Sequence, residues 1–122
     1  MHACDRSLPS CLDFSLARTS ELGLYRIELR PCLPCMSSGP LSRIEVSIAA
    51  RDGLAVDHAE VEVSGGMPQR GLRLAGSPVV RHRGGGSYRI EDLLLSPPGW
   101  WLLRLTVTAA AGVDIVTFNL VL

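Results

Sequence analysis

The residues with the clearest chemical potential are two cysteines and a methionine in one short segment, Cys32, Cys35 and Met36. Two thiolates and a thioether are soft sulfur ligands of the kind that Cu(I) prefers. The same spacing could supply half of a zinc site, but no second Cys-x-x-Cys and no His-x-x-x-His follows in the chain. The alternative is a local disulfide or two inert thiols in a loop, which is the more common meaning of a single Cys-x-x-Cys.

All the cysteines lie in the first third of the chain, because Cys4 and Cys11 precede the pair just described. An even number in two close pairs fits two disulfides in an oxidising compartment, or one metal site in a reducing one. The possible pairings stay open at the level of sequence. A thiol count separates the two interpretations, since free thiols favour a metal and oxidised ones favour a disulfide.

Arginines form a second group with chemical potential, because five of them fall within a short stretch: Arg70, Arg73, Arg81, Arg83 and Arg89. Guanidinium groups bind carboxylates and phosphates through paired hydrogen bonds. The cluster therefore predicts contact with an anion or an acidic partner surface, with an ordinary solvent-exposed face as the alternative.

Two tryptophans complete the candidates, because Trp100 and Trp101 are adjacent. On a strand, neighbouring side chains point to opposite faces. One of the two is therefore expected in the core and the other on a contact surface. We assign Trp100 to the contact surface, together with Arg70, Arg73, Arg81 and Arg83.

The composition of the chain limits the classes of function. The chain has 122 residues, 47% of them hydrophobic and 20% charged, which excludes disorder and indicates one domain. Twelve acidic residues balance twelve arginines, so the net charge gives no attraction to nucleic acid or to anionic lipid. Aromatic residues are 5%, too few to stack nucleic-acid bases. No Gly-x-Ser-x-Gly motif occurs, and we predict a non-catalytic protein with a protein partner.

Short segments of alternating polarity must position these residues, because a half-buried strand has a period of two. The segments are Leu24–Arg30, Ile44–Ile48, Val61–Val63, Tyr88–Leu93, Trp101–Val107 and Ile115–Leu122. Turn residues separate them, and no helical period is convincing. The pattern predicts an all-β, immunoglobulin-like antiparallel sandwich of seven or eight strands over residues 14–122. Residues 1–13 are expected to form a leader or tail, and Ser64–Pro78, which includes Met67, a long loop.

The longest apolar region is Trp100–Leu122, but Arg104, Asp114 and Asn119 interrupt it. We therefore predict no membrane span. The start of the chain shows no apolar stretch of the kind that a signal peptide needs. An apolar final strand predicts either a monomer or a dimer that pairs through its sheet edges.

Two sequence runs together are typical of a known group of proteins. Residues 61–69 read Val-Glu-Val-Ser-Gly-Gly-Met-Pro-Gln, and residues 97–103 read Pro-Pro-Gly-Trp-Trp-Leu-Leu. The runs at 24–27, 52–53 and 116–122 fit the same frame. The chain resembles, over residues 14–122, the FixH-like/YtkA-like group of small exported bacterial β-sandwich domains.

This resemblance implies a periplasmic or otherwise exported protein that serves copper handling or the assembly of haem-copper oxidases. The group usually has His-Gly-His-Gly after Met-Pro-Gln, where this chain has Arg70, Gly71, Leu72 and Arg73. It also tends to have a methionine before Pro-Gly-Trp-Trp, and this chain has none there. The resemblance therefore implies a degenerate metal site in which Met67 alone remains.

Two hypotheses for function follow from these patterns. The first is an accessory or binding module related to copper or to oxidase assembly, in which Cys32, Cys35 and Met36 hold Cu(I) and Met67 assists. The second is a structural or protein-interaction sandwich without metal, whose cysteines form disulfides and whose arginines and Trp100 form the contact face.

Overall fold

The computed structural model describes residues 13–31, 41–74, 76, 78–95 and 99–121. Nearly all regular structure in this part of the chain is β-strand, with one turn of 3-10 helix, η1 (Pro68–Arg70). No helix in it is long and apolar enough to cross a membrane. The strands are β1 (Ala17–Thr19), β2 (Tyr25–Pro31), β3 (Leu41–Ala50), β4 (Glu60–Met67), β5 (Leu72–Arg73), β6 (Val79–Gly84), β7 (Ser87–Leu94), β8 (Trp100–Ala109) and β9 (Gly112–Val121).

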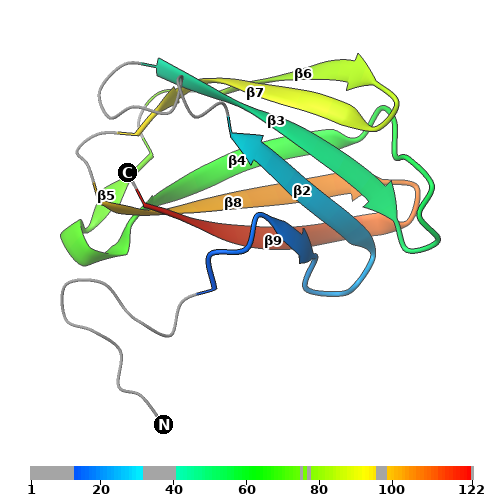
Figure 1. Ribbon diagram of the computed structural model, residues 1–122, viewed down its shortest axis with the longest axis horizontal. Coiled ribbons are helices and arrows are strands. Elements are labelled where there is room, and N and C mark those ends of the chain that lie inside the picture. Colours follow the sequence, from blue (N-terminus) through cyan, green and yellow to red (C-terminus); the bar gives the residue numbers. More distant parts are fainter. Residues whose placement is uncertain (1–12, 32–40, 75, 77, 96–98, 122) are drawn as a thin grey trace, which may run out of the picture.

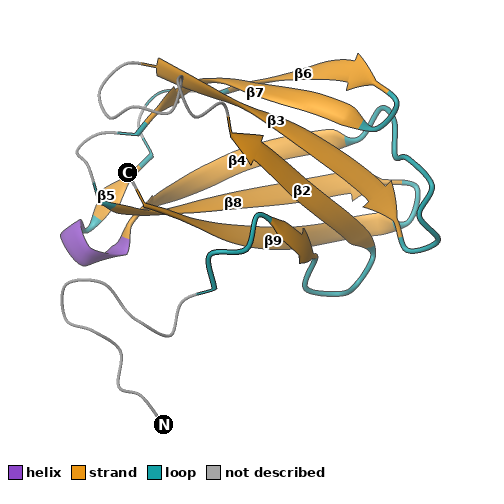
Figure 2. Ribbon diagram, in the orientation of Figure 1, coloured by secondary structure: helices purple, strands orange, loops and turns teal. Residues whose placement is uncertain are grey.

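The strands form two antiparallel sheets that pack face to face (Figures 1 and 2). The five-stranded sheet has the order β1-β2-β3-β7-β6, and the four-stranded sheet has the order β5-β4-β8-β9. Strands β2 to β9 can be lettered in chain order as A, B, C, C′, D, E, F and G, with β1 left without a letter. The five-stranded sheet then has the order β1-A-B-E-D, and the four-stranded sheet has the order C′-C-F-G. This is the arrangement of an immunoglobulin-like sandwich, so the predicted fold class is confirmed. The described residues form nine strands, against the seven or eight predicted, and the two shortest, β1 and β5, were not among those expected.

Alternation along each strand builds the core between the sheets. In β8, Trp101, Leu103 and Leu105 are buried, while Arg104 between them is exposed. The same period of two buries one face of β2, β3 and β7. Because successive side chains of a strand point to opposite faces, each sheet has one apolar face toward the core and one outer face.

The outer face of the five-stranded sheet is covered by paired charges. Arg30 and Glu28 lie 2.9 Å apart, and Arg89 and Glu45 lie 2.6 Å apart. Arg81 of β6 pairs with Glu91 of β7. The Arg89–Glu45 and Arg81–Glu91 pairs join neighbouring strands, whereas Glu28 and Arg30 both belong to β2. Cross-strand charge pairs are typical of a sheet face that meets water.

The prediction of a loop from Ser64 to Pro78 is wrong in its first half. Strand β4 continues to Met67, η1 follows, and β5 then pairs back onto β4. The strand was missed because Gly65 and Gly66 have no side chain with which to show an apolar period. Met67 ends the strand with its side chain 3% exposed, and it closes this end of the core.

The first described residues lie along the outer edge of β9. The Glu21 amide donates to the Ile115 carbonyl at 2.9 Å, and Arg18 Nη1 donates to the Thr117 carbonyl at 2.8 Å. Asn119 Nδ2 donates to the carbonyl of Asp13 at 2.8 Å. A dimer that paired through this edge of β9 would therefore have to displace the segment.

Candidate functional site

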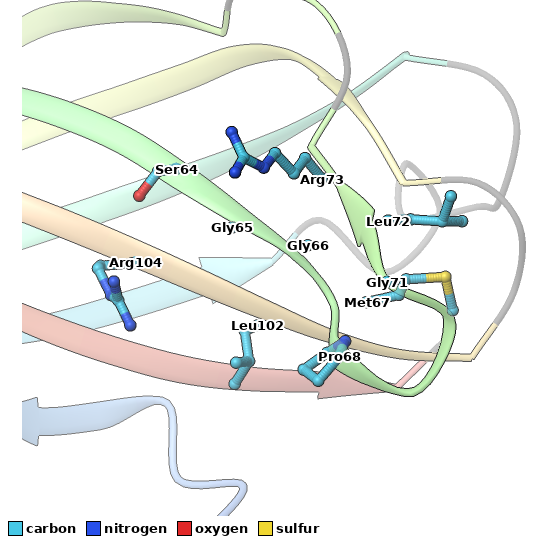
Figure 3. A pocket seen from close by; sticks show the side chains of 10 residues that line it. All are labelled: Ser64, Gly65, Gly66, Met67, Pro68, Gly71, Leu72, Arg73, Leu102 and Arg104. Carbon is cyan, nitrogen blue, oxygen red and sulfur yellow. The ribbon is translucent and has the colours of Figure 1, made fainter.

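The candidate site is a groove of about 480 Å³ on the four-stranded sheet, near the end where β4 turns into η1 and β5. Figure 3 shows the side chains that line it. Its residues come from β4, η1, β5 and β8: Ser64, Gly65, Gly66, Met67, Pro68, Gly71, Leu72, Arg73, Leu102 and Arg104. None of them is a histidine, a cysteine or a carboxylate, so the lining can bind a ligand but offers no general base.

Two glycines leave the middle of the groove without side chains. A Cβ on Gly65 would lie 2.1 Å from the Leu102 carbonyl oxygen, and one on Gly66 would lie 2.1 Å from that of Leu72. Real Cβ atoms do not approach this closely, so the backbones of β8 and β5 can come this near to β4 at Gly65 and Gly66 only because both residues lack a Cβ atom. The Leu74 amide then donates to the Gly65 carbonyl at 2.9 Å, which ties the returning chain to β4.

Two arginines border the glycine stretch. Arg73 of β5 is opposite Gly66 in the strand register, and Arg104 of β8 is opposite Ser64. Both side chains are exposed, and in Figure 3 they lie on either side of the β4 ribbon. Among the described residues, neither has an ion pair or a side-chain hydrogen bond. The sequence predicted Arg73 as a contact residue but missed Arg104, which lies outside the sequence cluster.

An apolar strip continues the groove along β8 to the end of the sheet. Trp100 and Leu102 are on the outer face of β8, and both are partly buried. Trp100 is paired with Val121 in the register, and Val121 is 52% exposed. The indole Nε1 of Trp100 donates to Asn119 Oδ1 at 3.0 Å, which holds the ring on this face. Trp101 is 1% exposed in the core, so the two tryptophans lie on opposite faces of β8 as predicted, and the role of Trp100 in partner contact stays a prediction.

The other predicted site residues are distributed as follows. Cys32, Cys35 and Met36 lie outside the described residues. Arg70 ends η1, between the lining residues Pro68 and Gly71, and is exposed, but it is not itself part of the lining. Arg81, Arg83 and Arg89 belong to the five-stranded sheet. The sequence cluster of arginines is therefore divided, and of its members only Arg73 lines the groove.

A second polar cluster, which the sequence did not predict, lies at the opposite end of the sandwich. The rings of His58 and His82 are 4.5 Å apart, and His82 Nε2 is 3.2 Å from Asp57 Oδ1. The Gly86 amide donates to the same Asp57 oxygen at 2.6 Å. This hydrogen bond, followed by the one from His82, holds the pKa of Asp57 below its ordinary value of 3.8.

This cluster ties the loop before β4 to the β6–β7 hairpin. Tyr88 completes it, because its hydroxyl donates to the Val56 carbonyl at 2.5 Å and accepts from the Ala59 amide at 3.0 Å. Across the described part of the chain, no three His, Cys, Asp or Glu side chains are arranged to hold a metal ion. We therefore assign the cluster a structural role.

Comparison with known proteins gives no family for the chain: no family model matches it, and no curated protein matches it.

Proposed function

We propose that this protein is a non-catalytic binding module that holds a protein partner on the outer face of its four-stranded sheet. The observation that carries the proposal is the contrast between the two outer faces. The five-stranded sheet presents arginine–glutamate pairs and two smaller hollows, of about 220 and 340 Å³. The four-stranded sheet presents the groove of about 480 Å³ and the apolar strip formed by Trp100 and Leu102.

The chemistry of this face supports a protein as the occupant. Partly exposed leucine, valine and tryptophan side chains that adjoin a hollow are typical of contact surfaces. Leu72, at the mouth of the groove, is 42% exposed. Tryptophan and arginine are the residues that most often dominate binding energy at protein interfaces, and Trp100 and Arg104 are both on this face.

The test is selection of binders from a displayed library of random dodecapeptides on the immobilised, folded protein. We expect the selected peptides to bind the Leu102→Ser variant at least ten-fold more weakly, because serine removes the apolar contact and puts a polar group in its place without a change of charge. The matched control is Thr108→Ser, an uncharged substitution on the same face of β8 but away from the groove. Its affinity should equal that of the wild type.

The proposal is overturned if the library yields no peptide whose binding depends on Leu102. Circular dichroism and the thermal midpoint of each variant establish that it is folded. Leu102 is partly exposed on the outer face, so the substitution leaves the buried side of β8 unchanged.

The copper hypothesis from the resemblance stays a prediction, with its ligands Cys32, Cys35 and Met36 outside the described residues. An anaerobic Cu(I) titration against a chromophoric chelator tests it, alongside a thiol count. If the hypothesis holds, the reduced protein binds one Cu(I) and the Cys32→Ser/Cys35→Ser variant loses at least ten-fold in affinity, because Cu(I) prefers sulfur ligands. Equal binding by the parent and the variant rejects these cysteines as ligands.

A further inference from the structure

We infer that the groove recognises an acidic side chain in an extended segment of the partner, held between Arg73 and Arg104. This inference rests on the function proposed above and specifies the chemistry of the partner. It is carried by the positions of the two arginines, by their lack of partners within the described residues, and by the distribution of charge along the face.

The strand register places the two arginines on either side of β4, where both line the groove. Arg73 is opposite Gly66 and Arg104 is opposite Ser64. Ser64 and Gly66 are alternate residues of β4, about 7 Å apart along the strand. Because Gly66 lacks a side chain, β4 places no side chain beside Arg73 at that position, and in Figure 3 the two arginines lie on either side of the β4 ribbon.

A carboxylate on the partner would give these two arginines the ion pair that they lack among the described residues. Within the described residues neither has an ion pair, and no acidic residue lines the groove. On the other sheet, Arg81 and Arg89 each have a glutamate partner, whereas Arg26 and Arg83 have no ion pair among the described residues and line no groove with a second arginine of that sheet's strands. Guanidinium groups bind carboxylates through short, charge-assisted hydrogen bonds, and the two arginines that line this groove offer a carboxylate a partner on each side.

The neighbouring side chains set the spacing of the segment. Leu102 is two residues from Arg104 on the same face of β8, again about 7 Å away. In an extended peptide, residues two apart point to the same side with the same spacing. An acidic residue followed at the second position by an apolar one would therefore place its carboxylate at the arginines and its apolar side chain on Leu102.

Charge along β4 sets the direction in which this segment lies. Glu60 and Glu62 are exposed on the same face as Ser64, farther from the groove. Their carboxylates repel an acidic residue at that end, whereas the arginines attract it at the groove. The apolar lining also favours a protein segment over a nucleic-acid backbone, since Leu72 and Leu102 offer no polar partner to sugars or phosphates.

The experiment applies the dodecapeptide selection to three proteins: the wild type, Arg73→Gln/Arg104→Gln and Arg26→Gln/Arg51→Gln. The last is the matched control, because Arg26 and Arg51 are exposed residues in β2 and just after β3, away from the groove. Both double variants lose two positive charges. We expect acidic-x-apolar sequences to be enriched on the wild type and on the control, and to disappear on the groove variant.

A synthetic copy of the leading peptide gives the quantitative result. It should bind Arg73→Gln/Arg104→Gln at least ten-fold more weakly than the wild type or the control. Replacement of its acidic residue by glutamine or asparagine should cause a similar loss on the wild type and none on the groove variant.

The outcomes separate this inference from the proposed function. If the selected peptides bind in a way that depends on Leu102 but contain no acidic residue, the recognition of an acidic side chain is overturned and the proposed binding function stands. The absence of any peptide that depends on Leu102 overturns both. An equal loss of peptide affinity on the control variant would show that the peptide is attracted by net charge, and it overturns the inference. Displacement of the peptide by an equimolar single-stranded oligonucleotide also overturns it.

Discussion

Replacement of Asp114 by alanine is expected to lower the free energy of unfolding by about 4 kcal/mol. The Asp114 side chain is only 3% exposed. It accepts hydrogen bonds from Ser20 Oγ at 2.6 Å and from the amides of Leu22 at 2.9 Å, Ile115 at 2.8 Å and Leu24 at 3.2 Å. Alanine would leave these donors without their acceptor and would loosen the segment before β2.

Urea denaturation of the wild type, Asp114→Ala and Asp52→Ala measures this effect. Asp52 is the matched control, because its carboxylate accepts one bond, from the Leu54 amide at 3.0 Å, in an exposed turn. The free energy of unfolding of Asp52→Ala should be close to that of the wild type. A loss below about 1 kcal/mol for Asp114→Ala would show that these hydrogen bonds do not stabilise the fold.

The contribution of Asp114 should also depend on pH. Burial opposes its ionisation, but the bonds from Ser20, Leu22, Ile115 and Leu24 outweigh burial and hold its pKa below the ordinary value of 3.8. A lowered folded-state pKa adds stability that is present above the unfolded pKa, about 3.9, and that is lost as the pH falls through the folded pKa. The difference between the wild type and Asp114→Ala should therefore be constant near neutral pH and shrink below about pH 4.

The same denaturation experiment at a series of pH values tests this expectation. The pKa values of Asp13 and Asp57 are also lowered, through hydrogen bonds from Ser15 and from Gly86. Both residues are present in the wild type and in the variant, so their contributions cancel in the difference. A difference that stays unchanged in acid would contradict the assignment of a charged, hydrogen-bonded Asp114.

Replacement of Gly66 by alanine is expected to lower the free energy of unfolding by about 3 kcal/mol and to distort the groove. The new Cβ would lie 2.1 Å from the Leu72 carbonyl oxygen and 3.2 Å from the Arg73 Cα. Both atoms belong to the backbone of β5, so no side-chain rotation can relieve the contact. Strand β5 would have to move away, and Arg73 would move with it.

Gly85→Ala is the matched control for this substitution. Gly85 is in the β6–β7 turn with φ +63°, and nothing lies within 4 Å of its added Cβ. Gly85→Ala should therefore lower the free energy of unfolding only through backbone strain, by about 1 kcal/mol. Urea denaturation should show a greater loss of unfolding free energy for Gly66→Ala than for Gly85→Ala. Equal stability of the two variants would contradict the close packing of β4 against β5.

The strands were predictable where polarity alternates. In β8, Trp101, Leu103, Leu105 and Val107 are buried, as the alternating pattern indicated, and β2 and β3 follow the same rule. Strand β4 was predicted only in its first half, because Gly65 and Gly66 have no side chain to display the pattern. Their role depends on how closely β8 and β5 approach, which is a property of the assembled sheets.

The candidate site was predicted only in part. Arg73, which lines the groove, was among the contact residues predicted from residue type, together with Arg70 and Trp100. Arg104 looked like an ordinary polar interruption of an apolar strand. Its importance comes from the strand register, which places it opposite Ser64 and near Arg73. Nearness in sequence was misleading for Arg81, which lies on the other sheet in an ion pair with Glu91.

The sequence by itself determined that this protein is an immunoglobulin-like sandwich. Alternation and turn residues act over a few positions, and they decide which face of each strand is apolar. The tertiary structure alone decided which polar groups meet. Ser20 and Asp114, 94 residues apart, share a hydrogen bond, and Arg73 and Arg104 border one groove. Such long-range contacts depend on strand order and register across the sheets, which local periodicity does not encode.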